Sequence, residues 1–371
     1  MNLLYISNLS NNIDAGLNWS VPATVKAQQE YDNVLWIDLS KDAYQPHWSE
    51  VRSYHNIKDF GGKLKLNLLP VPFNSPDCVI FEGFYYIDHV LFAYELLKNN
   101  IPYIIVPRSA FTSSAFNNGG LLKRIKKQIA HAFIFDYFVS KSCAIHYLTE
   151  EEKKESQKKY HKQSFIIPNG ITLPNVYKRT FSNGINGVFI GRQDIYQKGL
   201  DLLLESIREI KSELIDAGFR LDIYGPPRYD VKKVSEIIAN YEIGEIVKNH
   251  EKGVRGTDKE KTLLDADVFF LTSRFEGHPM GLIEALSYGI PALITRGANM
   301  AEEVKSYNAG WACETNKDDI KASMRQMIID KSLFSNISNN SRNLAKNYDW
   351  KTIGKRNHDV LLSLLDKNIP K

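Results

Sequence analysis

The chain has 371 residues, of which 43% are apolar and 24% are charged, and its formal net charge is +4. This length is too great for one ordinary hydrophobic core and predicts a globular protein with two domains. No stretch approaches the roughly 18 apolar residues that a membrane-spanning helix needs, and so slight a charge does not indicate a nucleic-acid partner.

The opening residues, MNLLYISN, lack a basic head and a long apolar segment, so they predict a first strand and not a signal peptide. Cys78, Cys143 and Cys313 are scattered without CxxC spacing, which argues against a zinc site and against a disulfide framework. We therefore expect a reduced, cytoplasmic protein.

Short apolar runs alternate with helical patterns over residues 1–170. The predicted strands are Leu3–Ser7, Val34–Asp38, Cys78–Phe81, Tyr103–Val106, Tyr137–Val139 and Phe165–Pro168. The predicted helices between them include Val21–Gln29, Val90–Asn99 and Leu121–Phe133. Such alternation is typical of βαβ units and predicts a mostly parallel sheet.

Turn-forming residues follow, in PNGITLPN from Pro168 and SNGING from Ser182, and predict an interdomain linker over 171–184. A second α/β series then covers residues 185–349. Its predicted strands are Val188–Ile190, Leu221–Tyr224, Val268–Leu271 and Ala292–Thr295, and its predicted helices are Leu200–Ile210, Val231–Ala239, Lys259–Leu264, Met280–Tyr288 and Ala298–Tyr307.

The predicted fold class is therefore α/β, with two doubly wound, Rossmann-like domains facing across a cleft. A last amphipathic helix is predicted at Ile353–Leu365. We expect the C-terminal segment 350–371 to pack back on the domain formed by residues 1–170.

Glu276 and Glu284 stand eight positions apart in FEGHPMGLIEAL, between a predicted strand and a predicted helix. Open α/β sheets bind ligands beyond the carboxyl ends of their strands, so these carboxylates are expected at a ligand site. Eight helical residues rise about 12 Å, whereas glycosidase carboxylate pairs lie roughly 5–9.5 Å apart. The pair therefore suits a long ligand held at two points; the alternative is two solvated surface acids.

Arg192 and Lys198 lie between Gly191 and Gly199, on the segment that joins the strand Val188–Ile190 to the next helix. A guanidinium fork, a compact ammonium and the N–H groups of a helix start suit an anionic diphosphate. The alternative is two solvated surface cations.

Glycines at other strand ends extend this pattern. Gly225 directly follows a predicted strand, Gly256 precedes a predicted helix, and Gly16 follows the loop after the first strand. Glycine there permits close backbone approach to a ligand, and the N–H of Gly16 could contact a phosphate; an ordinary turn is an equal alternative.

Taken in order, these segments resemble the retaining glycosyltransferases of family 4, which have the GT-B fold. The resemblance rests on GR followed by KG at 191–199, the strand that ends in Gly225, and Glu276 with seven residues before Glu284. Supporting similarities are the PNG at 168–170, YLTEEE at 147–152, AEEV at 301–304 with its later Gly310, and the closing Asp349–Trp350 helix. The resemblance thus covers nearly the whole chain.

The resemblance implies a hexosyltransferase-type enzyme that moves a sugar from a nucleotide-diphosphate donor, UDP rather than GDP, to a glycan or lipid-linked glycan in surface polysaccharide synthesis. Arg192 and Lys198 would bind the donor diphosphate and offset the charge of the leaving group. Glu284 would accept hydrogen bonds from the ribose, and Glu276 would hold hydroxyls of the transferred sugar. The implied catalytic residues are Glu276, Arg192 and Lys198. The further substrate-binding residues are Gly16, Arg108, Gly191, Gly225, Gly277, His278, Met280, Gly281 and Leu282.

Retention would follow front-face attack, in which a donor phosphate oxygen draws the proton from the acceptor; a covalent intermediate through Glu276 is the alternative. No metal and no cofactor is expected, because cationic side chains neutralise the donor. Many relatives have a histidine after the strand Tyr103–Val106, where this chain has Arg108. Arginine stays protonated and is a poor general base, so it would contact donor or acceptor instead. His89, elsewhere on the first domain, is expected to be structural.

The predicted helix Leu121–Phe133 carries Lys123, Arg124, Lys126 and Lys127 opposite apolar residues. A basic amphipathic helix of this kind suits an anionic membrane surface at the inner face of a membrane, and a solvated face over an ordinary core stripe is the equal alternative.

Other classes of α/β protein fit less well. The Gly-x-Gly-x-x-Gly of a nicotinamide dehydrogenase and the Gly-x4-Gly-Lys-Ser/Thr of a P-loop NTPase are absent. Two alternatives stay open: a GT-B sugar-nucleotide epimerase, against which the spacing of Glu276 and Glu284 argues, and a non-catalytic sugar-nucleotide-binding partner of a transferase. The presence of Arg192, Lys198 and both glutamates argues against the non-catalytic partner.

Overall fold

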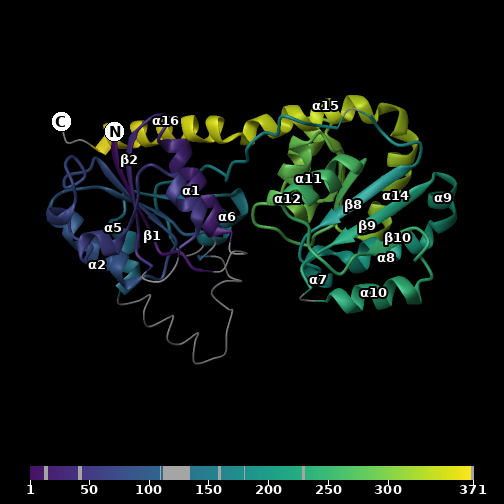
Figure 1. The fold of residues 1–371 in the computed structure, drawn as a ribbon, viewed down its shortest axis with the longest axis horizontal. Coiled ribbons are helices and arrows are strands. Elements are labelled where there is room, and N and C mark those ends of the chain that lie inside the picture. Colours follow the sequence, from purple (N-terminus) through teal and green to yellow (C-terminus); the bar gives the residue numbers. More distant parts are fainter. Residues whose placement is uncertain are drawn as a thin grey trace. The chain divides into compact units, whose positions relative to one another are not determined.

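A computed structural model describes residues 1–11, 16–40, 44–108, 110–111, 134–157, 160–178, 180–227 and 230–368. The chain forms two compact units (Figure 1). Unit 1 comprises Met1–Gly170 with Trp350–Lys371, and unit 2 comprises Ile171–Asp349. Every described helix is too short or too polar to span a lipid bilayer.

The described part of unit 1 is built on a seven-stranded sheet whose neighbouring strands all pair in parallel. The strand order is β3-β2-β1-β4-β5-β6-β7. The strands are β1 (Asn2–Ser7), β2 (Asn33–Asp38), β3 (Tyr54–Asn56), β4 (Cys78–Glu82), β5 (Tyr103–Val106), β6 (Ala144–Tyr147) and β7 (Ser164–Ile166). The α-helices are α1 (Leu17–Gln28), α2 (Ile87–Lys98), α5 (Asp136–Lys141), α6 (Glu150–Gln157) and α16 (Trp350–Asn368), and the 3-10 helices are η1 (Pro46–Glu50), η2 (Ile57–Phe60) and η3 (Leu66–Leu68).

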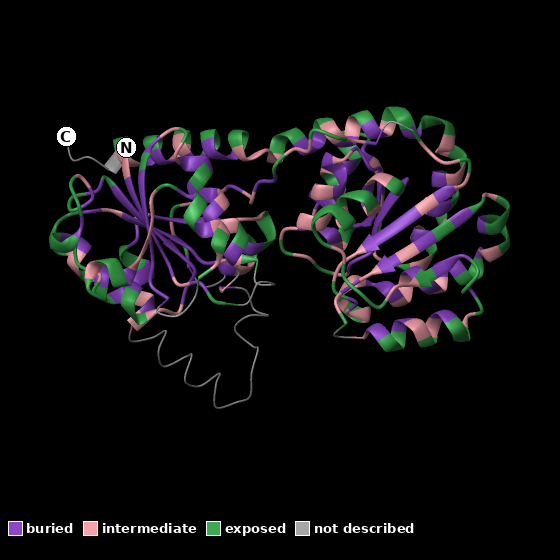
Figure 2. Cartoon of the chain, viewed as in Figure 1, coloured by how far each residue is buried: buried purple, intermediate pink, exposed green. Residues whose placement is uncertain are grey.

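Both faces of this sheet are covered, which explains why its strands are continuous apolar runs. Along β1, Leu4 and Ile6 belong to one core cluster, whereas Leu3 and Tyr5 belong to another. The buried strands stand out against the exposed outer faces of the helices in Figure 2.

The described part of unit 2 has a six-stranded sheet, again parallel, in the order β10-β9-β8-β11-β12-β13. The strands are β8 (Ile185–Ile190), β9 (Phe219–Tyr224), β10 (Val247–Asn249), β11 (Val268–Leu271), β12 (Ala292–Thr295) and β13 (Gly310–Cys313). The α-helices are α7 (Ile195–Lys198), α8 (Leu200–Glu209), α9 (Lys211–Asp216), α10 (Val231–Asn240), α11 (Gly256–Asp265), α12 (Met280–Ser287), α13 (Ala301–Ser306), α14 (Lys317–Ile329) and α15 (Phe334–Ala345). The 3-10 helices are η5 (Arg296–Ala298), η6 (Asp330–Leu333) and η7 (Lys346–Tyr348).

The two sheets share one topology. In each, the first strand of the unit is third in the sheet and the strand order reverses beside it, between β1 and β4 in unit 1 and between β8 and β11 in unit 2. Two parallel-sheet, Rossmann-like units confirm the predicted α/β fold class, whereas the cleft between them stays a prediction. Loops at the carboxyl ends of the strands beside such a reversal are where open α/β sheets bind ligands.

One predicted strand is wrong, because Tyr137–Val139 lies in the helix α5. Phe138 and Val139 are buried while Tyr137 and Lys141 are exposed, a helical alternation that a three-residue aromatic run does not reveal. The predicted helix Ala298–Tyr307 is also divided, into η5 and α13. The predicted basic helix Leu121–Phe133, with its four cations, lies outside the described residues.

The helix α16 packs on α1 through a close backbone contact. A Cβ atom added to Gly354 would lie 2.6 Å from the carbonyl oxygen of Ala27, so a larger residue would push the helices apart. Beside this contact the Asn357 amide donates to Gln28 at 2.8 Å, and His358 Nδ1 lies 2.9 Å from Asp32 Oδ2. Polar pairs therefore fix the position of α16 along α1.

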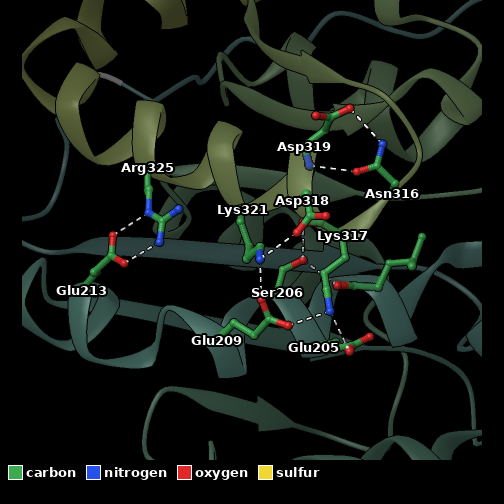
Figure 3. Close-up of polar contacts among 11 residues, drawn as sticks. Glu205, Ser206, Glu209, Glu213, Asn316, Lys317, Asp318, Asp319, Lys321 and Arg325 are labelled. Carbon is green, nitrogen blue, oxygen red and sulfur yellow. Dashed lines mark hydrogen bonds and ion pairs between the residues drawn. The ribbon is translucent and has the colours of Figure 1, made fainter.

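A ladder of ion pairs joins α14 to α8 and α9 on the surface of unit 2 (Figure 3). The acidic side chains of α8 and α9 and the basic side chains of α14 each recur every four residues, so each set lies along one face of its helices. The acidic residues are Glu205, Glu209 and Glu213, and the basic residues are Lys317, Lys321 and Arg325. The distances are 3.0 Å for Lys317–Glu205, 2.6 Å for Lys317–Glu209 and 2.7 Å for Arg325–Glu213, and Lys321 also contacts Glu209.

Candidate active site

Three of the glycines predicted to contact a ligand lie together at the carboxyl end of β8. A Cβ atom on Gly225 would lie 2.5 Å from the carbonyl oxygen of Gly191, and one on Gly281 would lie 3.5 Å from that of Ile190. The N–H of Gly191 also donates to the carbonyl of Tyr224 at 3.0 Å. The loops after β8 and β9 and the start of α12 therefore meet at one place, beside the reversal of strand order.

Lys198 is the last residue of the short helix α7, and not a loop residue as the sequence predicts. Asp194 begins this helix by accepting the N–H of Gln197 at 2.8 Å, and Gly199 ends it with φ +60°. A Cβ atom on Gly199 would lie 2.0 Å from the carbonyl oxygen of Thr272, so only glycine permits this approach. The Thr272 hydroxyl donates to the carbonyl of Lys198 at 3.2 Å, which fixes α7 against the end of β11.

The structure brings Lys198 and Glu276 into direct contact. Lys198 Nζ lies 2.5 Å from Glu276 Oε1, and the side chains are only 12% and 9% exposed. The Ser273 hydroxyl donates to the same oxygen at 2.6 Å. Asn299, whose φ is +60°, donates its amide to the backbone carbonyl of Glu276. The carboxylate is thus held in one position, and each charge offsets the desolvation of the other.

Arg192 lies at the exposed side of the same loop. Its Nη2 donates to Gln197 Oε1 at 3.1 Å, so the guanidinium lies along α7. Gln197 in turn donates its side-chain amide to the carbonyl of Phe275 at 3.5 Å, in the loop that carries Glu276. Both predicted cations are therefore linked to the loop between β11 and α12.

Glu284 lies on the second turn of α12 and contacts Lys259 of α11. The two side chains are 34% and 26% exposed, so a ligand has access to both. Directly after the end of α12, the Tyr288 hydroxyl donates to Glu260 at 3.1 Å, and burial raises the pKa of Tyr288 to about 12. The phenol therefore stays protonated at neutral pH and acts as a donor.

The other predicted residues of this loop differ in what they can offer. Gly277 has open space where a Cβ atom would stand, so its glycine is not sterically required. The ring of His278 lies 5.7 Å from that of Tyr348, in a tilted contact. Met280 is half-buried, whereas Leu282 is 1% exposed and belongs to the core of unit 2. The side chain of Leu282 is therefore closed to a ligand, and this residue can offer only its backbone groups.

In unit 1, Arg108 has structural partners instead of an open binding position. Its Nε donates to Glu82 at 2.8 Å and its Nη1 to Asn169 at 2.6 Å, and the Arg108 and Glu82 side chains are 5% and 1% exposed. This ion pair joins the ends of β4 and β5 to the chain that leaves unit 1. Gly16 precedes α1 with φ −56° and has open space around it, so its backbone is accessible but its glycine is not conformationally required.

His89 is fully buried between the rings of Phe81 and Tyr86, each with its centroid 4.9 Å away. Burial lowers the pKa of His89 to about 3, so the imidazole is neutral at physiological pH. These contacts are those of a core residue, as expected from the sequence.

Comparisons with known proteins show similarity to glycosyltransferases. Residues 183–344, which include every predicted site residue of unit 2, match the family model "Glycosyl transferases group 1". The chain is 23% identical over 228 residues to the uncharacterized glycosyltransferase MJ1178 of Methanocaldococcus jannaschii, covering 61% of each protein. It is 29% identical over 127 residues to the putative colanic acid biosynthesis glycosyltransferase WcaL of Escherichia coli, covering 32% of this chain and 30% of that protein. The matched region thus spans about three-fifths of MJ1178 and less than a third of WcaL.

Among solved structures, Anabaena HepE in complex with UDP superimposes with a TM-score of 0.69 over 98% of this chain and 100% of that one, at 14% identity. At this identity the likeness concerns the fold, which is that of the GT-B glycosyltransferases. The match to the glycosyl transferases group 1 family model is thus confined to residues 183–344, whereas the likeness in fold extends over 98% of the chain.

Proposed function

We propose that this protein is a retaining glycosyltransferase that transfers a hexose from a nucleotide-diphosphate donor to a glycan or lipid-linked glycan in surface polysaccharide synthesis. The observation that carries the proposal is the contact between Lys198 and Glu276 at the carboxyl ends of β8 and β11, in a glycosyl transferases group 1 domain. The complex of HepE with UDP supports UDP as the nucleotide.

The charges of the site assign a role to each group. Lys198 and Arg192 bind the donor diphosphate, and their attraction strengthens as the departing nucleotide gains negative charge. Glu284 accepts hydrogen bonds from the ribose hydroxyls, and Glu276 accepts them from hydroxyls of the transferred sugar. Because the ammonium of Lys198 has three N–H donors, it can bind a phosphate oxygen while keeping Glu276 in place.

The reaction proceeds by front-face attack. The acceptor hydroxyl forms the new bond to the anomeric carbon on the side from which the diphosphate leaves, and a phosphate oxygen takes the acceptor's proton. Cationic side chains neutralise the leaving group, so the reaction is independent of a metal ion. Arg108 serves this scheme by holding the end of β5, not as a base.

A lipid-linked acceptor would bring the protein to an anionic inner membrane surface from the cytoplasm, through Lys123, Arg124, Lys126 and Lys127. Co-sedimentation with anionic vesicles at increasing salt tests this part. Binding that weakens with salt is expected, because the Debye length shortens from about 10 Å at 0.1 M to about 3 Å at 1 M. Absence of binding at low salt would contradict it.

The donor assignment is tested by thermal stabilisation with UDP, GDP, ADP and their sugars. A ligand at 100 times its Kd stabilises the folded protein by about 2.7 kcal/mol. UDP is expected to give the largest shift in wild type and a much smaller one in Lys198→Ala, whereas Lys248→Ala, an exposed lysine of β10, serves as the control. Stabilisation without donor turnover would favour the non-catalytic alternative, and interconversion of donor sugars would favour an epimerase.

A further inference from the structure

A second feature of unit 1 lies at the carboxyl ends of β1 and β2. Trp19 stands in the first turn of α1, which follows β1, and His47 stands in η1, which follows β2. The two rings stack with centroids 4.1 Å apart and planes within 3° of parallel. This aromatic platform, Trp19 on His47, lies at the edge of the sheet where α/β proteins bind ligands.

The platform is held rigidly from below. His47 Nε2 lies 2.8 Å from the carbonyl oxygen of Asn18, to which the indole N–H of Trp48 also donates at 2.9 Å. Trp48 is fully buried, meets His47 edge to face at 6.2 Å and packs on Trp36. The imidazole on which Trp19 stacks is therefore anchored to the core of unit 1.

Trp19 is nevertheless the most exposed tryptophan of the chain, at 51%, whereas Trp36 and Trp48 are fully buried and Trp311 is 8% exposed. Another aromatic residue, Tyr44, precedes η1 on the loop after β2 and is 55% exposed. The N–H of Tyr44 donates to Asn11 at 3.1 Å, which ties this loop to the loop after β1. An indole that stacks on an anchored ring and is still half exposed, placed at a ligand-binding edge, is suited to stacking on a ligand.

We propose that Trp19 is the platform on which a pyranose ring of the acceptor saccharide stacks, an inference that rests on the proposed transferase function. The C–H groups on one face of a pyranose carry partial positive charge and match the negative face of the indole. The exposed polar residues on the two loops that follow β1 and β2, Asn11 and Tyr44, suit sugar hydroxyls and carry no fixed charge. The diphosphate-binding cations belong to unit 2, so a sugar and not the nucleotide is the ligand here.

The experiment measures iodide quenching of tryptophan fluorescence in the full chain, with and without methyl glycosides of glucose, galactose, mannose and N-acetylglucosamine. Trp19→Phe identifies the share of the quenching that belongs to Trp19. At least one glycoside is expected to protect Trp19 from iodide in wild type. Trp19→Ala is expected to weaken its binding, followed by titration calorimetry, by about threefold to tenfold, and Trp19→Phe by less, because a smaller ring still stacks.

Tyr137→Ala is the matched control, since Tyr137 is also an exposed, stacked aromatic residue of unit 1, 43% exposed with Tyr94 5.5 Å away. Glycoside affinity is expected to be unchanged in this variant. Protection by none of the glycosides, equal affinity in Trp19→Ala, or protection by UDP alone would each overturn the proposal. Thermal stabilisation by UDP distinguishes the two kinds of failure. If UDP stabilises Trp19→Ala as it does wild type, an unchanged glycoside affinity contradicts only the role of Trp19 and not the transferase assignment.

Discussion

The two sheets place different chemistry at the same topological position. In unit 1 the ends of β4 and β5 carry the Glu82–Arg108 pair, which is almost fully buried. In unit 2 the end of β11 is followed by Glu276, which meets Lys198 in a pair that keeps about a tenth of each side chain exposed, with Arg192 beside it in solvent. The topology of the sheet therefore decides where charged side chains gather. The degree to which each ion pair is buried decides whether it stabilises the fold or remains available to a ligand.

The buried pair of unit 1 should show the largest effect. Arg108→Met leaves the Glu82 carboxylate buried without its partner, so we expect the free energy of unfolding to fall by about 3–5 kcal/mol. Urea unfolding followed by tryptophan fluorescence measures this, because Trp36 and Trp48 are buried in unit 1. The double variant Arg108→Met/Glu82→Leu should recover most of the loss; if the single variant is as stable as wild type, Arg108 is not structural.

The pair of unit 2 should show its main effect in turnover, with a smaller loss of stability than the pair of unit 1, because its side chains keep more contact with water. Lys198→Ala and Arg192→Ala are each expected to lower donor turnover by about 10²-fold or more, because each contact strengthens as the leaving group gains charge. Initial rates with a UDP-sugar measure this, with Lys248→Ala as the control. Near-normal rates in both variants would refute the phosphate assignment.

Acid should affect unit 1 through two buried histidines. Burial lowers the pKa of His89 to about 3 and that of His146 to about 4. Below about pH 6.5 these histidines are protonated in the unfolded chain but stay neutral in the folded protein. The free energy of unfolding therefore falls as the pH decreases from about 6.5 toward the folded-state pKa values. Each histidine is expected to cost about 2 kcal/mol at pH 5, from about 1.4 kcal/mol per pH unit.

The measurement compares urea unfolding of wild type and His89→Phe between pH 7 and pH 4. The variant should lose less stability, and the difference between the two proteins removes the opposite contribution of Asp38, whose pKa is raised mainly by burial. Identical pH profiles would show that His89 titrates normally in the folded protein.

Residue patterns predict the sheets and the position of the candidate site, but not the partners of its side chains. Apolar runs identify β1, β5 and β11 because a strand buried on both faces leaves a local signal. Arg108 and Glu82 stand 26 positions apart, and Lys259 and Glu284 stand 25 apart, so their pairing depends on how the strands are arranged. The strand ends that carry the candidate site residues could therefore be predicted from the sequence, whereas the buried pairing of Arg108 with Glu82 could not.

The ion-pair ladder of α14 should show the smallest effect, and it sharpens the comparison. Its side chains (Figure 3) are chemically like those of the two strand-end sites. Arg325 and Glu213, however, are 50% and 44% exposed. Water and salt screen exposed pairs, and ordering two long side chains costs entropy. Arg325→Ala is therefore expected to lower the thermal midpoint only slightly at low salt and not measurably in 1 M NaCl. A large loss that persists in high salt would show that exposure does not separate structural from dispensable charges here, and the distinction drawn between the two strand-end sites would fail with it.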